Sequence, residues 1–176
     1  MDNDLVTYIE RLELMGFFAG YPFIFALVHY IAGGQHKKTG ALPERLKKLL
    51  PLAYALTGTL YFGLIMSNIF PDYSFKNIAA QFQNPFQLWG LLSLLCWLPV
   101  FRKKAYFSVL HSLPVFLLLF KDLATGIYYS GGGDMIKNDM KIYTDSLLVN
   151  TGTLVLVTII FFLQNRARQR DNVSAF

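Results

Sequence analysis

Cysteine is almost absent from this chain: Cys96 is the single one among 176 residues. One cysteine excludes an intramolecular disulfide, and it cannot form a thiolate metal site alone. Cys96 lies beside Trp97 in an apolar segment, where we expect a buried and unreactive thiol. Charge is scarce as well. Asp, Glu, Lys and Arg make up 15% of the residues, whereas soluble domains carry about 25%, so the composition argues against a soluble protein.

Catalytic signatures are absent too. The sequence has no P-loop, no GxSxG elbow, no HExxH and no CxxC motif. The glycine run at 131–133 does not fit the GxGxxG pattern of dinucleotide-binding loops. We therefore predict a protein that is not an enzyme and that holds no metal or cofactor.

Apolar residues are what the chain has in abundance. Hydrophobic residues make up 54% of it, with 16 phenylalanines and 10 tyrosines. Because a membrane-spanning helix needs about 20 mainly apolar residues, we predict an all-α integral membrane protein that forms one membrane domain over residues 1–176. The acidic N-terminal segment lacks the positive region of a secretory signal, so we expect the first span to be retained. The predicted spans are 14–33, 49–70, 85–101 (which is short), 105–128 and 146–164, followed by a short basic tail at 165–176.

Positive charges gather on alternate connections between the predicted spans. Eleven Lys and Arg residues lie in the first and third connections and the tail, and four lie on the opposite side. The positive-inside rule then puts the N-terminus outside and the C-terminus in the cytoplasm, as in a bacterial inner membrane. Because the charge is divided by side, we expect no direct nucleic-acid binding. The eleven residues, which form a predicted inner docking face or simply contact anionic lipid, are Lys37, Lys38, Arg45, Lys47, Lys48, Arg102, Lys103, Lys104, Arg166, Arg168 and Arg170.

Two segments on the predicted outer side are amphipathic. Residues 4–12 and 73–83 each place apolar side chains at helical spacing with polar residues between them. We expect both to lie along the outer interface as short helices that anchor the bundle, or that act as a lid. The remaining outer connection, residues 130–141, contains three consecutive glycines and is predicted to be the most mobile part of the chain.

Polar residues recur along one face of three predicted spans. In the fourth span Asp122 shares a stripe with His111, whereas Lys121 lies about 80° away and can extend to the outer headgroups. Because lipid offers polar groups no partner, we expect these stripes to face the bundle interior. The resulting polar seam would either bind the helices together or conduct protons or ions. Its predicted members are Ser108, His111, Asp122, Thr125, Asn68, Tyr61, Asn150, Thr151 and Thr158.

The first span contains the motif GFFAG, which is followed by a proline. Gly16 and Gly20 allow a close approach of helices, either within the chain or between copies of it. Pro22 cannot donate an amide hydrogen bond and is predicted to free a carbonyl of the preceding turn. These three residues are the predicted helix-packing set.

Two histidines leave a further alternative open. His29 and His111 fall at similar depth on different spans, so they could supply both axial ligands of a b-type haem. Hydrogen bonds from these imidazoles to hydroxyl groups are the simpler interpretation.

The sequence therefore predicts a non-enzymatic membrane subunit or anchor of a larger assembly, for example a bacterial defence, secretion or envelope-stress complex. Such a protein would form a parallel homo-oligomer and dock a cytoplasmic protein through its inner face. The alternative is a small channel or transporter for protons, ions or a small solute along the polar seam. A docking subunit needs the basic residues, whereas a conductor needs the seam.

Overall fold

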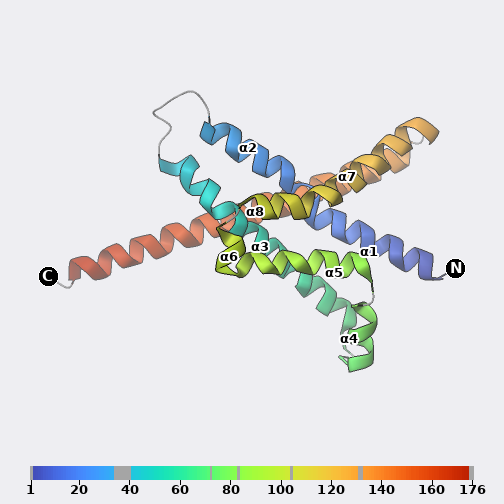
Figure 1. The fold of residues 1–176 in the computed structure, drawn as a ribbon, viewed down its shortest axis with the longest axis horizontal. Helices are drawn as coiled ribbons and strands as arrows, with labels where there is room; N and C mark the ends of the chain where they lie inside the picture. Colours follow the sequence, from blue (N-terminus) through green and yellow to red (C-terminus); the bar gives the residue numbers. More distant parts are fainter. Residues whose placement is uncertain are drawn as a thin grey trace.

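Helices make up nearly all of the part of the chain that the computed structural model describes, namely residues 2–33, 41–71, 73–82, 84–103, 105–130 and 133–174. No strand occurs among these residues, and the prediction of an all-α chain is confirmed. The elements, shown in Figure 1, are α1 (Asp2–Phe18), α2 (Tyr21–Gly33), α3 (Ala41–Ile69), α4 (Phe75–Gln81), α5 (Pro85–Leu91), the 3₁₀ helix η1 (Leu92–Trp97), α6 (Pro99–Arg102), α7 (Ala105–Ser130) and α8 (Gly133–Ser174).

Four stretches are long and apolar enough to span a bilayer: Tyr8–Ala32, Glu44–Ile69, Ala105–Tyr128 and Ile136–Ala167. They correspond to the first, second, fourth and fifth predicted spans. The third predicted segment contains a shorter apolar stretch, Pro85–Trp97, made of α5 and η1. The seven residues of α5 and six of η1 extend about 20 Å, less than the ~30 Å of a hydrocarbon core. The fold is that of a helical membrane protein with four full-length candidate spans.

The two ends of the molecule are built from different elements (Figure 1). One, called the N-terminal end, holds the start of α1, helix α4, the end of α7 and the start of α8. The other, called the basic end, holds the end of α2, the start of α3 and the end of α8. Helices α3 and α7 run away from the basic end, whereas α2 and α8 run toward it.

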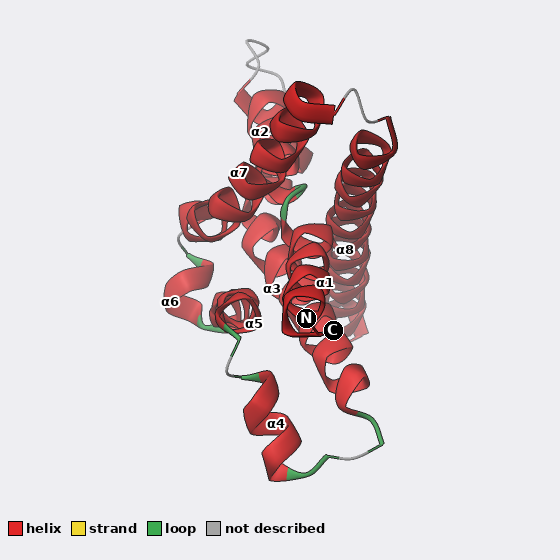
Figure 2. Cartoon of the chain, turned by 90° about the vertical axis from the view of Figure 1, so that its right-hand side faces the viewer, coloured by secondary structure: helices red, strands yellow, loops and turns green. Residues whose placement is uncertain are grey.

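Helix α1 lies at the centre of the N-terminal end, where it contacts α3, α5, α7 and α8 (Figure 2). It is continuous from Asp2, so the prediction that residues 4–12 form a separate interfacial helix is wrong. The reason is that their helical pattern continues into the first span, where Leu14 and Met15 are buried. The second amphipathic segment does form a separate short helix, α4, at the edge of the molecule.

Helix α8 is far longer than the predicted fifth span. It has 42 residues, or about 63 Å at 1.5 Å per residue. Its start at Gly133 corrects the prediction of a mobile connection over 130–141, because the described residues from Gly133 onward are helical. Gly131 and Gly132 lie outside the described residues. A helix this long extends beyond the ~30 Å hydrocarbon core of a bilayer.

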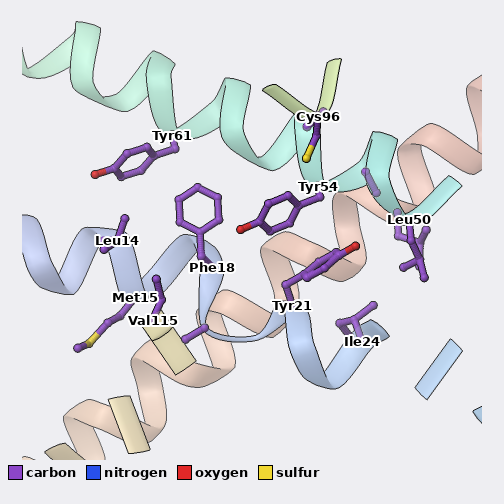
Figure 3. Packing of buried hydrophobic residues seen from close by; sticks show 14 of the residues in the cluster. Leu14, Met15, Phe18, Tyr21, Ile24, Leu50, Tyr54, Tyr61, Cys96 and Val115 are labelled. Atoms are coloured by element: carbon purple, nitrogen blue, oxygen red, sulfur yellow. The ribbon is translucent and has the colours of Figure 1, made fainter. Parts of the chain in front are cut away.

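Four aromatic side chains from α1, α2 and α3 lie in the buried interior, surrounded by aliphatic ones (Figure 3). The rings of Tyr21 and Tyr54 lie 4.3 Å apart between centroids, and Phe18 packs 5.5 Å from Tyr54 and 5.4 Å from Tyr61. All four side chains are at most 2% exposed. The centre of the bundle is therefore a packed core.

Helices α7 and α8 each have a face, away from the buried core, that exposes large apolar side chains. Leu110, Leu117 and Ile127 of α7 are more than half exposed, as are Leu148 and Leu163 of α8. Water would solvate such surfaces poorly, whereas lipid tails are as apolar as the side chains themselves. These faces therefore suit contact with the bilayer.

Candidate functional site

The first predicted span is broken into two helices. Helix α1 ends at Phe18 and α2 begins at Tyr21, with Pro22 in the first turn of α2. Proline is tolerated there because the amides of a first turn have no partner within the helix. The break leaves backbone groups of the preceding turn without their usual helical partners.

Two polar side chains of α8 bind the backbone at this break. The amide of Gly20 donates to Ser146 Oγ at 2.8 Å, and Asn150 Nδ2 donates to the carbonyl of Phe17 at 2.7 Å. Asn150 also donates to the carbonyl of Ser146 within its own helix. The α1–α2 junction is thus fixed to α8 by hydrogen bonds that lie one helical turn apart.

The two glycines of the GFFAG motif have different surroundings. A Cβ atom on Gly20 would lie 2.7 Å from the backbone nitrogen of Leu147, so glycine is required for α8 to approach this closely. A Cβ atom on Gly16 would meet nothing within 4 Å. Gly20 therefore allows helix packing within the chain, whereas there is space for a side chain at Gly16.

His111 of α7 is held on both ring nitrogens. Tyr54 Oη lies 2.5 Å from Nδ1, and the carbonyl of Trp89 lies 2.6 Å from Nε2. Because a carbonyl only accepts, Nε2 carries the proton and the hydroxyl of Tyr54 donates to Nδ1. Trp89 Nε1 in turn donates to the carbonyl of His111, and the two rings stack with centroids 5.1 Å apart.

The arrangement of the histidines does not favour a haem site. Haem ligation needs a free imidazole nitrogen from each ligand, and both nitrogens of His111 are already hydrogen-bonded. His29 stacks on Phe25 and lines a cavity at the basic end, outside the aromatic core. Among the described residues, no group of three or more His, Cys, Asp or Glu could hold a metal ion.

Further hydroxyl groups link the remaining helices. Tyr21 and Ser108 share a hydrogen bond of 2.7 Å between α2 and α7, and Thr57 and Thr153 share one of 3.1 Å between α3 and α8. Each pair buries its polar atoms against the other, so these contacts bind helix to helix.

The predicted polar seam is only partly inside the bundle. Four of its members are buried: Ser108, His111, Tyr61 and Asn150. Thr125, Thr151 and Asn68 are exposed, so the prediction that they face the interior is wrong. Thr158 is half-buried and donates to the carbonyl of Leu154 in its own helix. A threonine can satisfy its hydroxyl in this way, which is why a polar residue in a span need not face inward.

Asp122 has a different partner from the one predicted. Instead of lying with His111, it accepts from Arg11 of α1, whose Nη2 is 2.8 Å from both carboxylate oxygens. Each side chain of the pair is about one quarter exposed. Lys121 is exposed, as expected for a side chain that points away from the bundle.

A second polar group lies beside this ion pair at the N-terminal end. Glu10 of α1 accepts from Gln87 Nε2 of α5 at 2.8 Å and also from Asn84. Glu13 is 3.5 Å from the amide nitrogen of Asn68 on α3. Sequence reasoning missed Glu10, Arg11 and Glu13 as functional candidates. Their signal was the charged stretch ERLE directly before the first apolar run.

A cavity at the basic end is here called the basic pocket. It has a volume of about 500 Å³ and lies between the end of α2, the start of α3 and the α6–α7 turn. Its lining residues are His29, Lys47, Lys48, Pro51, Pro99, Arg102, Lys103 and Ala105. Four residues of the predicted inner docking face therefore surround one concave surface.

The other predicted docking residues are spread more widely. Arg45 is exposed on α3, and Arg166 is exposed on α8. Lys37, Lys38 and Lys104 lie outside the described residues, as do the side chains of Arg168 and Arg170.

No protein-family model, curated protein or solved structure matches this chain. The molecule has a concave cationic surface at one end, partly buried and hydrogen-bonded carboxylates at the other, and a packed aromatic core between them.

Proposed function

We propose that this protein is a non-enzymatic membrane anchor whose basic pocket docks an acidic segment of a cytoplasmic protein. The observation that carries the proposal is the convergence of Lys47, Lys48, Arg102 and Lys103 on one cavity of about 500 Å³. These residues come from two parts of the chain more than fifty positions apart. Their convergence creates a positive potential that a single loop would not give, and concave cationic surfaces attract anionic partners.

Most cations of the basic pocket are available to a partner. Lys47 lies 3.3 Å from Glu44 one turn earlier, but that exposed pair contributes little. Lys48, Arg102 and Lys103 are exposed and form no ion pair with another described residue. A carboxylate-bearing ligand would relieve the mutual repulsion of these charges.

Helix α8 favours a protein partner over lipid alone. It continues well past the other helices at the basic end (Figure 1), and Arg166 in its C-terminal part is exposed. An arm that extends beyond the bundle would lie past the headgroup layer, where a soluble protein can reach it. We propose that the arm and the basic pocket bind the same partner.

The packed aromatic core favours docking over conduction. Phe18, Tyr21 and Tyr54 fill the space between the helices along which a permeant would have to pass. The hydroxyl of Tyr21 is hydrogen-bonded to Ser108, that of Tyr54 to His111, and that of Thr57 to Thr153. A polar seam of this kind supports helix association.

The proposed topology has five crossings, with the N-terminus outside and the C-terminus in the cytoplasm of a bacterial inner membrane. It is supported by the basic pocket, because Arg102 and Lys103 share it with Lys47 and Lys48 of α3. The turn after the third segment thus lies beside the start of α3, so this segment returns the chain to the basic end although it is shorter than a full span. Copies of the chain would associate in parallel through their lipid-facing surfaces.

Cysteine labelling tests this topology. In a Cys96→Ala background, Ser130→Cys should react with an impermeant thiol reagent on intact cells, and Ser174→Cys should react only after lysis. Reaction of both from outside would contradict the topology.

Affinity purification in mild detergent tests the docking. The variant Arg102→Gln/Lys103→Gln should lose a co-purifying soluble protein by about five- to thirty-fold, since two rim charges contribute about 1–2 kcal/mol together. Lys76→Gln/Lys121→Gln removes two exposed charges elsewhere and is the matched control. A synthetic peptide with the sequence of the captured protein's acidic segment should also bind to the purified membrane protein. Equal capture by both variants, or a change confined to bound phospholipid, would contradict the proposal.

A further inference from the structure

A second cavity lies between α7 and α8, which pack side by side at the N-terminal end. Its volume is about 230 Å³, and its walls are apolar or aromatic except for one carboxylate. The aromatic walls are Phe116, Phe120 and Tyr143, with Met140 and two leucines of α7 beside them. The carboxylate is that of Asp139. The cavity is here called the Asp139 pocket.

Asp139 is buried without being satisfied. Its side chain is 5% exposed, and its Oδ2 atom is buried with no hydrogen-bond partner among the described residues. A buried carboxylate oxygen without a donor is costly, and native structures rarely keep one without a reason. The atom that lacks a donor belongs to the residue that lines the cavity.

The charges around Asp139 leave room for one more cation. Asp122 and Arg11 both act electrostatically on Asp139, with opposite signs. Arg11 already binds both carboxylate oxygens of Asp122 at 2.8 Å. One guanidinium therefore stands against two carboxylates, and the group carries a net charge of about −1 when both are ionised.

The lining of the pocket selects the kind of cation. A divalent metal ion prefers several oxygen ligands, but the walls here are apolar apart from Asp139 and the hydroxyl of Tyr143. Aromatic faces attract organic ammonium groups by cation–π interaction, and apolar walls suit a hydrocarbon body. A protonated amine also brings the N–H donor that Oδ2 lacks.

We propose that the Asp139 pocket binds a small organic amine in its protonated form, with Asp139 as the counter-charge and hydrogen-bond acceptor. Phe116 and Tyr143, whose ring centroids lie 6.3 Å apart, contact its apolar body. The proposal stands apart from the docking at the basic end, because the two sites share no residue.

Two probes of nearly equal shape test this site in the purified full-length protein. The amine 2-phenylethylamine is protonated at neutral pH, and 2-phenylethanol is its uncharged counterpart. Titration calorimetry should show the amine binding at least about tenfold more tightly than the alcohol, because only the amine pairs with a desolvated carboxylate. Equal affinities for the two probes would overturn the proposal.

Three variants test which residue causes the preference for the amine over the alcohol. Asp139→Asn keeps the side-chain shape, removes the charge and should abolish the preference for the amine. Asp145→Asn removes an exposed carboxylate of the same helix and should leave the preference unchanged. Tyr143→Leu should weaken binding of the amine more than binding of the alcohol. Thermal melting followed by circular dichroism checks that each variant is folded. A preference that survives in Asp139→Asn, or that is lost equally in Asp145→Asn, would overturn the assignment.

Discussion

The two ends of this molecule hold charged residues in opposite ways. At the basic end, Lys48, Arg102 and Lys103 are exposed and make no ion pair with another described residue. At the N-terminal end, Arg11 and Glu10 lie within the bundle, and each is bound to a residue far away in sequence. The charges at one end are offered to the surroundings, whereas those at the other are used to hold helices together.

The difference follows from the surroundings of each charge. An exposed cation is solvated, so it can be retained for a partner or for orientation at little cost to folding. A charge carried into the bundle has to be paired or hydrogen-bonded, because an unpaired one is costly there. Substitutions at the two ends should therefore differ in kind: stability changes at the N-terminal end and binding changes at the basic end.

The largest effect is expected where α1 is held against α8. In Gly20→Ala, the added methyl group would lie 2.7 Å from the backbone nitrogen of Leu147 and push the two helices apart. We expect a loss of about 1–3 kcal/mol in the free energy of unfolding, measured by thermal melting in detergent.

Gly16→Ala is the matched control from the same motif. Its methyl group enters open space in an α-helix, where alanine is favoured over glycine by up to about 1 kcal/mol, so stability should rise or stay level. If Gly16→Ala instead destabilises the protein and weakens its oligomer, a second copy packs on that face.

The next largest effect is expected at the ion pair of the N-terminal end. Arg11→Ala leaves Asp122 without its partner and should cost about 1–2 kcal/mol of stability, since solvent reaches part of the pair. The double variant Arg11→Ala/Asp122→Asn should recover part of that loss, because it removes the unpaired charge. Lys48→Ala at the basic end should change stability by less than about 0.5 kcal/mol. Equal losses in Arg11→Ala and Lys48→Ala would remove the distinction between the two ends.

The smallest effect is expected at Lys121, next to Asp122 in the sequence. Although it belongs to the N-terminal end, it is exposed, so Lys121→Ala should behave like Lys48→Ala and change stability by less than about 0.5 kcal/mol. Melting curves of Lys121→Ala and Asp122→Ala compare the neighbours directly. A loss in Lys121→Ala as large as that in Asp122→Ala would mean that position along the chain, and not burial, decides the cost.

Much of the architecture could be predicted from the sequence. The long apolar runs gave the helices and four of the spans, because their signal lies in consecutive residues. The break between α1 and α2 was not predicted, although Pro22 was expected to free a carbonyl of the preceding turn. The clustering of cations near residues 47 and 102 was also visible as composition.

The partners of the polar residues could not be predicted in the same way. Helical periodicity says which residues share a face, but not which neighbouring helix covers that face. Asp122 was therefore assigned to the stripe of His111, although Arg11 of α1 binds it. Thr125 and Thr151 share faces with buried residues and are nevertheless exposed.

The sequence alone determined that this chain is helical, apolar enough for a membrane, and divided in charge between its loops. Those properties depend on local composition and spacing, which need no knowledge of neighbours. Tertiary structure alone decided that α1 enters the bundle with its charges and that Ser146 and Asn150 hold the α1–α2 break. It also decided that Oδ2 of Asp139 is buried with no donor among the described residues. These features depend on which helices pack together, and packing joins residues that lie more than a hundred positions apart in the chain.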